Sequence, residues 1–292
     1  MAVTNGWGQA AVNNTNGYGK GAINATNDWG EVYADSSSGE TNIGVSTTPS
    51  FANTYSLNFD GVDDVVAMTD VLDMANDGTD AYSISVWFKT THTGSYQILV
   101  SKQKSTSAFN GYSLSMRGDL QRLHFFLGTV TGNDRLAGRT GTITSVNDGN
   151  WHHVALTYDG SQAIGGFTLY YDGASEAITT EYNNTPTSVA NSADFLIGAR
   201  GTGGSPALYF DGNIDETSYF TSELSSSDVT AIYNSGVPAS LTSYSPVGWW
   251  RMGEEGTWSG GREWILTDQG SGGNDGTSVN MVEASRETDV PT

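Results

Sequence analysis

Short runs in which hydrophobic and polar residues alternate fill the middle of the chain, from about residue 51 to about residue 245. In YSLNFDG, Leu57 and Phe59 fall on the same face of an extended segment, because successive side chains point to opposite faces. In YSISVWFKT, the side chains of Ile84, Val86 and Phe88 share a face in the same way. Similar runs are YQILVSK, GYSLSMRG, LHFFLGTV, WHHVALTYDG, FTLYYDG, DFLIGAR and ALYFDG. This pattern predicts an all-β fold of two packed antiparallel sheets.

Turn-forming residues separate these runs. Asp-Gly pairs follow an aromatic residue at four places, namely 60–61, 159–160, 172–173 and 211–212. Because Asp-Gly readily adopts the backbone conformation of a tight turn, each pair is expected to end a strand.

One short helix is predicted in the segment SSSDVTAIYNSG. A serine at 225–227 can cap its first turn, where Asp228 also lies. Val229, Ile232 and Tyr233 have the spacing of one helix face, and Gly236 is expected to end the helix. A helix of this length should pack on the edge of the sandwich.

The first fifty residues contain a repeat. Residues 5–15, 16–26 and 27–37 align without a gap, and Trp7, Tyr18 and Trp29 occupy the same place in each unit. Glycines flank the aromatic residues and apolar residues are sparse, so we expect an extended arm that does not fold alone. The regular aromatic spacing suits docking on a partner surface, and a flexible linker is the alternative.

Residues 246–292 are expected to add one or two strands to the sandwich, since 47 residues seldom form a stable core unaided. We therefore divide the chain into three parts. These are an extended N-terminal repeat arm (1–50), a β-sandwich (51–245) and C-terminal strands with a polar tail (246–292).

Composition and charge narrow the classes of partner. The chain has 292 residues, a formal net charge of −20 and no Cys. The charge favours solubility, argues against nucleic acid and anionic lipid, and is compatible with divalent cations. Without Cys there are no disulfides, thiolate metal sites or Cys nucleophile. We expect no membrane insertion and no secretory signal, because no stretch of 18 apolar residues occurs and the N-terminus has no basic start.

Four stretches follow one another in the order SLNFDGVDDVVAM (56–68), YSISVWFKT (82–90), WHHVALTYDG…FTLYYDG (151–173) and FLIGARG…YFDGNIDETSYFTSELSSSDVTAIYNSG (195–236). Residues 55–236 thereby resemble the laminin-G-like domain of the concanavalin A-like jelly-roll superfamily. The resemblance implies an antiparallel jelly-roll sandwich. The stretch WWRMGEEG…DQGSGGNDGTSVN resembles a segment that normally precedes the FDG strand, but here it follows the domain. It can fill that place in this chain or in a neighbouring one.

The repeat units, which lead into DSSSGETNI, resemble the N-termini of structural proteins from tailed bacteriophages. This resemblance implies that Trp7, Tyr18 and Trp29 anchor the protein to a virus particle. A virion protein released by lysis needs no signal peptide.

Calcium is the best-motivated ligand, since the resemblance implies an ion held by loop Asp side chains at one edge of the jelly roll. The candidate ligands are Asp60, Asp63 and Asp64 in FDGVDD, and Asp211, Asn213 and Asp215 in FDGNID. Oxygen-rich loops suit a hard cation that takes six to eight oxygen ligands. The alternative is that an Asp-Gly pair only forms a turn and binds no ion. Because the four Asp-Gly junctions cannot all be calcium sites, most of them are expected to be turns alone.

Glycosidases of this fold carry two or three acids that alternate on one strand, so that two carboxyl groups flank the scissile bond. No such run occurs in this sequence, and the neighbours Glu254 and Glu255 would point to opposite faces of a strand. His152 and His153 are also neighbours, and the resemblance implies a structural role for them. We therefore predict that the protein is not an enzyme.

Sugar-binding faces stack aromatic rings on sugar C–H groups and add hydrogen bonds from polar side chains. The candidates are Tyr96, Tyr112, Arg139, Arg200 and Tyr209, with Phe109 and Arg135 as further loop residues.

We predict a non-enzymatic virion protein, of the tail-fibre or capsid-decoration kind. The arm anchors it, and the sandwich adheres to host-surface polysaccharide, where many copies make weak sites useful. Expected partners are other virion proteins and further copies of this chain in a homo-oligomer. The alternatives are a secreted bacterial carbohydrate-binding module with an extracellular location, and a purely architectural virion protein without a ligand.

Overall fold

The computed structural model describes residues 32–35, 42–45, 51–104, 109–143, 145–201 and 206–292. The chain divides into two units, Met1–Ala52 and Asn53–Thr292. In the first unit, β1 (Val32–Asp35) and β2 (Asn42–Val45) pair in antiparallel fashion. The repeat residues Trp7, Tyr18 and Trp29 lie outside the described residues, so the predicted anchoring role is not tested by the structure.

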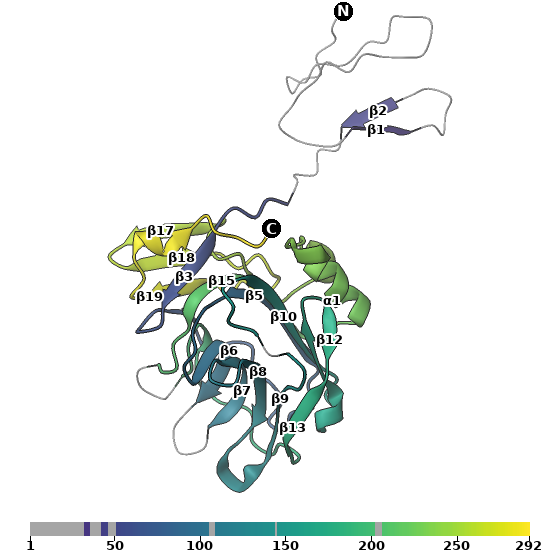
Figure 1. Ribbon diagram of the computed structural model, residues 1–292, viewed down its shortest axis with the longest axis vertical. Helices are drawn as coiled ribbons and strands as arrows, with labels where there is room; N and C mark the ends of the chain where they lie inside the picture. The colour runs from purple at the N-terminus through teal and green to yellow at the C-terminus, as the bar shows by residue number, and fades with distance from the viewer. Residues whose placement is uncertain (1–31, 36–41, 46–50, 105–108, 144, 202–205) are drawn as a thin grey trace, which may run out of the picture. The chain divides into compact units, whose positions relative to one another are not determined.

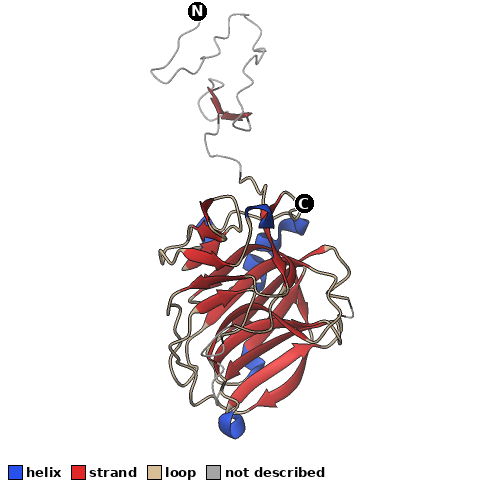
Figure 2. Cartoon of the chain, turned by 90° about the vertical axis from the view of Figure 1, so that its left-hand side faces the viewer, coloured by secondary structure: helices blue, strands red, loops and turns tan. Residues whose placement is uncertain are grey.

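The second unit is a sandwich of two antiparallel sheets, and strands make up most of it (Figure 2). Figure 1 shows β5 and β10 in one sheet and β6 to β9 in the other. The eight-stranded sheet contains β3 (Ser56–Asp60), β5 (Tyr82–Lys89), β10 (Trp151–Tyr158), β11 (Phe167–Tyr171), β12 (Ala174–Glu176), β15 (Asp211–Phe220), β16 (Gly248–Trp250) and β20 (Arg286–Glu287). The ten-stranded sheet contains β4 (Val65–Met68), β6 (Tyr96–Lys104), β7 (Asn110–Arg117), β8 (Arg122–Gly128), β9 (Arg135–Thr140), β13 (Ile178–Asn183), β14 (Phe195–Ile197), β17 (Gly256–Gly260), β18 (Glu263–Leu266) and β19 (Gly276–Val279). The predicted all-β, concanavalin A-like sandwich is thus confirmed.

Strands that are distant in sequence lie side by side in both sheets. The eight-stranded sheet has the order β12-β11-β10-β5-β15-β3-β20, with β16 also paired to β15. The ten-stranded sheet has the order β13-β9-β8-β7-β6-β14-β4-β19-β18-β17. Many residues lie in the sequence between neighbouring strands such as β5 and β15, or β6 and β14. This is the arrangement of a jelly roll.

The C-terminal residues contribute more than the one or two strands predicted, and that expectation was wrong. β16 and β20 join the eight-stranded sheet, while β17, β18 and β19 extend the ten-stranded sheet beyond β4. All of these strands pair within one chain. In the structure, the segment that resembles an N-terminal strand of the family therefore fills that place within the same chain.

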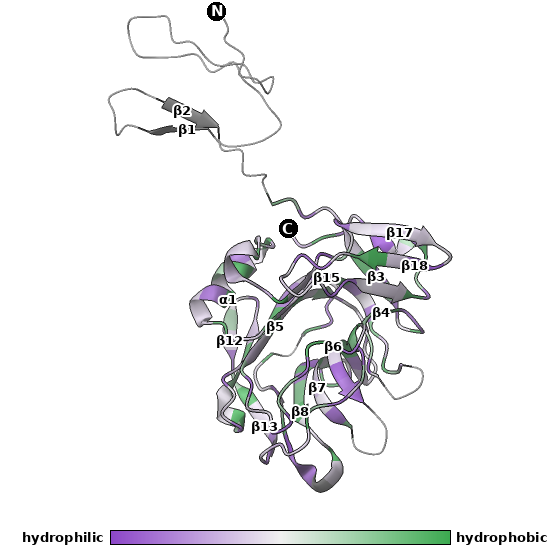
Figure 3. Ribbon diagram, turned by 180° about the vertical axis from the view of Figure 1, so that it is seen from behind, coloured by the Kyte–Doolittle hydropathy of each residue, from purple (hydrophilic) through white to green (hydrophobic). Residues whose placement is uncertain are grey.

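The core lies between the two sheets, and hydrophobic stretches recur along the strands that enclose it (Figure 3). In β5, Ile84, Val86 and Phe88 point into the core and are fully buried, as their alternation predicts. Each such side chain contributes about 1.5–3 kcal/mol when it is removed from water. Trp87 faces the opposite side, where the Tyr233 ring covers it at a centroid distance of 5.7 Å.

The predicted helix is present as α1 (Ser226–Tyr233). The Ser225 hydroxyl accepts a hydrogen bond from the Asp228 N–H, and the Asp228 carboxylate accepts one from the Ser225 N–H. This reciprocal pair is a capping box. The helix ends at Asn234, which has a left-handed φ of 47°, and not at Gly236 as expected, because Asn tolerates this conformation.

Five short 3-10 helices complete the secondary structure of the described residues. They are η1 (Thr131–Asn133), η2 (Ile164–Gly166), η3 (Asn234–Gly236), η4 (Thr242–Tyr244) and η5 (Glu283–Ser285). None of the helices in the described part of the chain is long and apolar enough to cross a membrane.

Candidate functional site

The outer face of the ten-stranded sheet carries a small hydrophobic patch. In β4, Val66 and Met68 belong to the core, so the alternate residues Val65 and Ala67 point outward. Leu196 on the neighbouring strand β14 also points outward and packs with Val65. The patch therefore lies on the side of the sheet that faces away from the core.

A cavity of about 550 Å³ lies over this patch, and we call it pocket A. Its floor is apolar, because it is formed by outward side chains of β4, β14 and β19. The lining residues are Asp63, Val65, Ala67, Lys104, Ser192, Ala193, Asp194, Leu196, Gly201, Pro206, Tyr209, Val279 and Asn280. Three strands that are far apart in the sequence therefore build one pocket.

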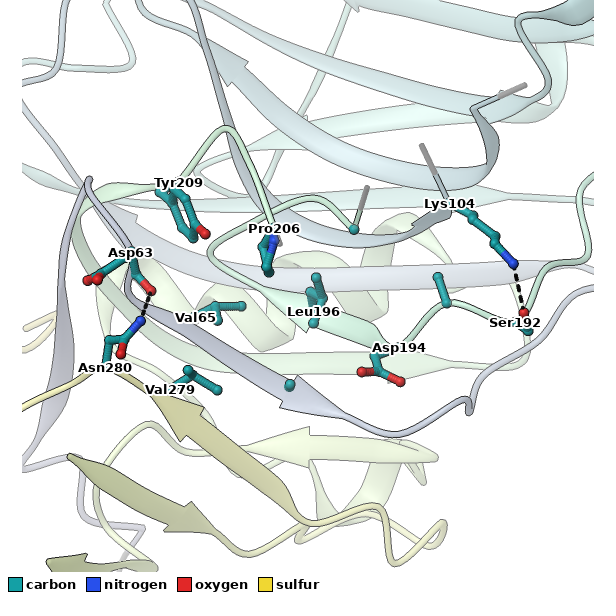
Figure 4. A pocket seen from close by; sticks show the side chains of 13 residues that line it. Asp63, Val65, Lys104, Ser192, Asp194, Leu196, Pro206, Tyr209, Val279 and Asn280 are labelled. Carbon is teal, nitrogen blue, oxygen red and sulfur yellow. Dashed lines mark hydrogen bonds between the residues drawn. The ribbon is translucent and has the colours of Figure 1, made fainter. Parts of the chain in front are cut away.

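Polar groups lie at both ends of pocket A (Figure 4). At one end, the Asn280 amide donates a hydrogen bond of 3.3 Å to the Asp63 carbonyl oxygen. At the other end, Lys104 Nζ donates to the Ser192 hydroxyl over 3.1 Å. Tyr209 lines the pocket beside Asp63, and burial, followed by the Asp63 charge, raises the pKa of the Tyr209 phenol.

A second cavity of about 270 Å³, which we call pocket B, lies further along the same sheet. Its lining residues are Tyr96, Ile98, Gln103, Phe109, Ser113, Ser115, His124, Phe126, Val130, Arg200 and Leu208. Arg200 and Leu208 line pocket B, while Gly201 and Pro206 line pocket A. Paired backbone hydrogen bonds join Arg200 to Ala207, and the Ile98 N–H donates to the Leu208 oxygen over 3.1 Å.

The predicted glycan-binding residues are distributed over this face. Tyr209 lines pocket A, while Tyr96 and Arg200 line pocket B. Arg139 lies on β9 rather than in a loop, and its Nε is 3.1 Å from a Glu181 carboxylate oxygen.

Tyr112 is a correction to the prediction. It lies in β7 and not in a loop, its side chain is 1% exposed, and its hydroxyl donates to the Leu72 carbonyl oxygen over 2.7 Å. A ring that is closed off from solvent cannot contact a glycan. The alternation of GYSLSMR already places Tyr112 on the same face as Leu114 and Met116, both of which are buried.

The FDGVDD loop brings three predicted metal ligands together. Carboxylate oxygens of Asp60, Asp63 and Asp64 lie within 4.8 Å of one another. One Asp60 oxygen accepts hydrogen bonds from three backbone N–H groups of the loop, of Val62, Asp63 and Asp64. Burial, and then the Asp60 charge, raise the pKa of Asp64 to about 6. The loop therefore concentrates negative charge, and its oxygen donors suit a hard cation.

The FDGNID residues do not form the second ligand group that was predicted. They belong to β15, where Asp211 is exposed and has an oxygen 3.4 Å from His92 Nδ1. Asn213 is buried and donates to Glu287 over 2.9 Å. Asp215 is fully buried, and its oxygen lies near those of Glu216 and Glu254 instead.

Three carboxyl groups and one guanidinium form this buried cluster. Asp215 accepts a hydrogen bond from the Asn53 amide over 2.8 Å, and Glu254 accepts from the Tyr55 N–H over 2.8 Å. Glu216 accepts from the Trp249 indole over 2.6 Å, and it pairs with Arg251 over 3.0 Å. The cluster therefore connects β15 to the first residues of the second unit, Asn53 and Tyr55, and to the C-terminal segment that holds Trp249, Arg251 and Glu254.

Burial raises the pKa of all three acids in the cluster, because a charge loses its hydration there. The pKa of Glu216 reaches about 7, since burial outweighs the lowering effect of Arg251 and Trp249. These groups lie apart from both pockets, whose lining does not include them.

His152 and His153 point to opposite sides of β10. His152 lies between Asp172 and Asp148, at 2.9 and 3.1 Å. Burial lowers its pKa, but the hydrogen bonds to these two acids outweigh burial and raise it. His153 is fully buried against Ser85, 2.8 Å away, and burial lowers its pKa to about 4. Neither lines either pocket.

Sequence reasoning missed most of the pocket lining. Val65, Ala67 and Leu196 occupy outward positions of strands that read as core segments, because their neighbours are hydrophobic too. His124 also lines pocket B, on the outward side of β8. The signal that could have found them is the period-two alternation of each strand once its core face is known.

The geometry defines a jelly-roll β-sandwich whose larger sheet carries two pockets on its outer face. The chain belongs to the concanavalin A-like lectin/glucanases superfamily, since the Laminin_G_3 profile of that superfamily matches residues 59–230. The predicted laminin-G-like resemblance is thereby confirmed for this part of the chain. No curated protein matches the sequence.

Several solved structures are similar in fold. A structure from Bacteroides ovatus, provisionally assigned as a carbohydrate binding protein, has a TM-score of 0.58 at 16% identity, over 83% of this chain and 62% of that one. The SAP-like pentraxin of Limulus polyphemus has a TM-score of 0.47 at 15% identity, over 62% of this chain and 82% of that one. For the CBM40 of the Ruminococcus gnavus IT-sialidase, the TM-score is 0.46 at 16% identity, over 61% and 97%. At these identities the similarity shows the fold alone, and this chain spans about 62% of the B. ovatus protein.

Proposed function

We propose that this protein binds carbohydrate through pocket A. The observation that carries the proposal is an apolar floor with hydrogen-bonding groups at both ends, in which Ala67 and Val279 are accessible and the buried Val65 and Leu196 lie beside them. A sugar ring presents C–H groups on its face and hydroxyls at its edge, so it matches a pocket of this kind. The superfamily and the provisional assignment of the B. ovatus structure agree with the proposal.

The proposal predicts that the Tyr209 ring contributes to binding. Tyr209→Ala is expected to weaken binding about tenfold, because it removes the aromatic surface next to the apolar floor. Full-length protein, multimerised on a carrier, would first be applied to an array of bacterial-surface glycans. Affinity for the strongest ligand would then be measured by titration calorimetry.

Two matched variants make the result specific. Tyr209→Phe keeps the ring and should retain most of the affinity, while Tyr244→Ala removes a tyrosine outside both pockets and should change nothing. A silent array would contradict glycan binding and favour the architectural alternative. Equal affinities for all variants would show that the ligand binds elsewhere.

We further propose that the protein is not an enzyme. Hydrolysis of a glycosidic bond requires two carboxyl groups on either side of one sugar linkage, with one of them kept protonated. Three of the acids with raised pKa values lie in the buried cluster, away from the pockets. Release of reducing ends from a bound glycan, lost in Asp63→Asn and Asp194→Asn, would overturn this part of the proposal.

The Asp60–Asp63–Asp64 loop is proposed to hold a structural calcium ion, because a divalent cation would offset the repulsion among its carboxylates. Calcium at about 100 times its Kd is expected to stabilise the native state by about 2.7 kcal/mol. For a domain of this size, the melting midpoint should rise by about 5–10 °C. Thermal melts with calcium and with a chelator measure the difference.

The control for this prediction compares two Asp→Asn changes of equal charge. Asp64→Asn removes a ligand and should abolish the calcium response. Asp211→Asn should preserve it, because the Asp211 carboxylate is not part of the group of three. A melting midpoint that changes with neither calcium nor chelator would disprove the calcium site.

The finer proposal is that the sandwich is displayed on a bacteriophage particle, as a homo-oligomer anchored by residues 1–50. The sequence repeat with Trp7, Tyr18 and Trp29 is the observation that favours it. An extracellular bacterial carbohydrate-binding module is the competing proposal. Deletion of residues 1–50 should abolish incorporation into purified particles, and continued incorporation would rule out the anchoring role.

A further inference from the structure

Arg200, in pocket B, is a charged side chain without a counter-charge. Its Nε is buried and has no hydrogen-bond partner, and among the described residues no carboxylate forms an ion pair with it. Its guanidinium lies over the Phe109 ring, 4.8 Å from the centroid. Burial lowers the pKa of Arg200, and no neighbouring acid acts in the opposite direction. A buried N–H group that loses water without gaining an acceptor is costly for the free protein.

The backbone around Arg200 is strained where it lines the pocket. Phe109 and Leu208 have positive φ values of 45° and 58°, a region that residues with side chains seldom occupy. Such conformations persist only where the surrounding structure imposes them, and they concentrate at binding sites. Here the Phe109 ring lies beneath the guanidinium, and Phe109 and Leu208 both line pocket B.

The remaining lining of pocket B is largely apolar, with Ile98, Phe126, Val130 and Leu208, and it includes no carboxylate. Ser113, Ser115 and Gln103 supply hydroxyl and amide groups, and His124 lies beside Ser115 on the neighbouring strand. The His124 ring bonds the Glu181 carboxylate through Nε2 at 2.9 Å, so that this acid is already engaged.

The strands next to pocket B hold most of the arginines of an acidic protein. Five of the eight Arg residues of the chain lie between residues 117 and 200, on β7, β8 and β9 and in the loop that holds Arg200. Among the described residues, Asp119 pairs with Arg117, and Glu181 pairs with Arg139 and His124. The Arg117 guanidinium also lies 4.7 Å from the centroid of the Tyr96 ring, which lines the pocket. These guanidinium groups are concentrated in one part of a chain with a net charge of −20, and eight Asp and Glu residues share the range 117–200 with them.

We propose that pocket B binds the carboxylate of an acidic sugar, with Arg200 as its receptor. The planar guanidinium can donate two parallel hydrogen bonds to a carboxylate, and Phe109 holds the plane in position. Ser113 and Gln103 would donate to the ring hydroxyls, while the Ser115 hydroxyl already donates to the His124 carbonyl oxygen. This inference rests on the proposed carbohydrate binding and specifies its ligand class as uronic acid-containing polysaccharide.

The test uses the full chain and polysaccharides that differ only in charge. Polygalacturonate, alginate and hyaluronan serve as carboxylate probes, carboxyl-reduced polygalacturonate as the neutral match, and dextran sulfate as a sulfate source. The wild type is expected to bind at least one polyuronate. Binding to carboxyl-reduced polygalacturonate should be about 10- to 100-fold weaker than to polygalacturonate, if that is the polymer bound.

Substitutions assign the effect to one side chain. Arg200→Gln should weaken binding by about 10- to 100-fold, while Arg200→Lys should give an intermediate loss because an ammonium lacks the planar fork. Lys89→Gln changes the net charge equally but lies outside pocket B, so its affinity should match the wild type. Thermal melting checks that each variant is folded. If Arg200→Gln does not fold, the affinity of Arg200→Lys is the measurement that tests the inference.

Several results would overturn the inference. These are failure to bind any polyuronate, equal binding of native and reduced polymer, equal losses in Arg200→Gln and Lys89→Gln, or binding of dextran sulfate alone. Neutral glycans that bind in a Tyr209-dependent way would meanwhile leave the proposed function intact. Failure of the glycan array and the polyuronates together would reject both proposals.

Discussion

Truncation after residue 245 is expected to abolish folding of the sandwich. The missing segment contains Trp250 and Trp264, which are 0% and 2% exposed, and Trp250 stacks on Phe195 at 5.5 Å. Removal of one such side chain costs about 3–5 kcal/mol, and an entire domain is stable by only about 5–15 kcal/mol. The truncated chain would also leave β3 and β4 without their partners β20 and β19. Near-ultraviolet circular dichroism and urea titration should show no cooperative transition.

Deletion of the opposite end is the matched control, because it removes a similar number of residues. Without residues 1–50 the second unit, which begins at Asn53, should keep its unfolding midpoint. Addition of a peptide spanning residues 246–292 should restore the near-ultraviolet signal of the truncated chain. A cooperative transition in the truncated chain alone would show that the C-terminal strands are an accessory and not part of the core.

The fold could be predicted from the sequence where a strand has one hydrophobic face. The alternation in YSISVWFKT identified the core positions of β5, and the capping serine and Asp228 identified the start of α1. The number of C-terminal strands could not be predicted, because β16, β18 and β19 have only three or four residues each. Strands this short carry too few alternations to be distinguished from turns.

The candidate site was less predictable than the fold. Its residues become neighbours only through the pairing of β4 with β14 and β19. In the sequence, β14 begins more than 100 residues after the end of β4, and β19 begins more than 200 residues after it. Arg200 and Tyr209 were identified because aromatic rings and hydrogen-bonding side chains in loops are what sugar-binding faces use. Asp215 was misplaced because FDGNID reads as a turn, whereas the structure continues it as a central strand with a bulge between Asp215 and Ser218.

That bulge brings two carboxyl groups into the interior side by side. Adjacent residues of a regular strand point to opposite faces, but here Asp215 and Glu216 both lie within 4.8 Å of Glu254, and Glu216 has a positive φ of 44°. The Arg251 guanidinium pairs with Glu216, and its charge also opposes the rise that burial causes in the pKa of Glu254. The stability of the sandwich should therefore depend strongly on this arginine and on pH.

Arg251→Met is expected to destabilise the protein by about 3–5 kcal/mol at pH 9, because it leaves the buried Glu216 carboxylate without its partner. Burial already raises the pKa of Glu216 to about 7, above its value in the unfolded chain, so the native state binds the proton more tightly. Such a group contributes stability below its unfolded pKa and loses it as pH rises through the native pKa. Loss of Arg251 raises the native pKa further. The difference between variant and wild type should therefore open above about pH 7.

Urea unfolding of both proteins between pH 5 and pH 9 measures this difference. At pH 5 Glu216 is protonated in both native states, so the loss should be smaller by about 1–2 kcal/mol, the equivalent of roughly one pKa unit. The double variant Glu216→Gln/Arg251→Met removes both charges and keeps an acceptor for the Trp249 indole, which donates to Glu216 over 2.6 Å. It should recover much of the stability at pH 9 and respond less to pH. If single and double variants instead lose the same amount at every pH, the role of Arg251 is packing against the Trp249 ring, 5.7 Å from its guanidinium, and charge compensation in the cluster is refuted.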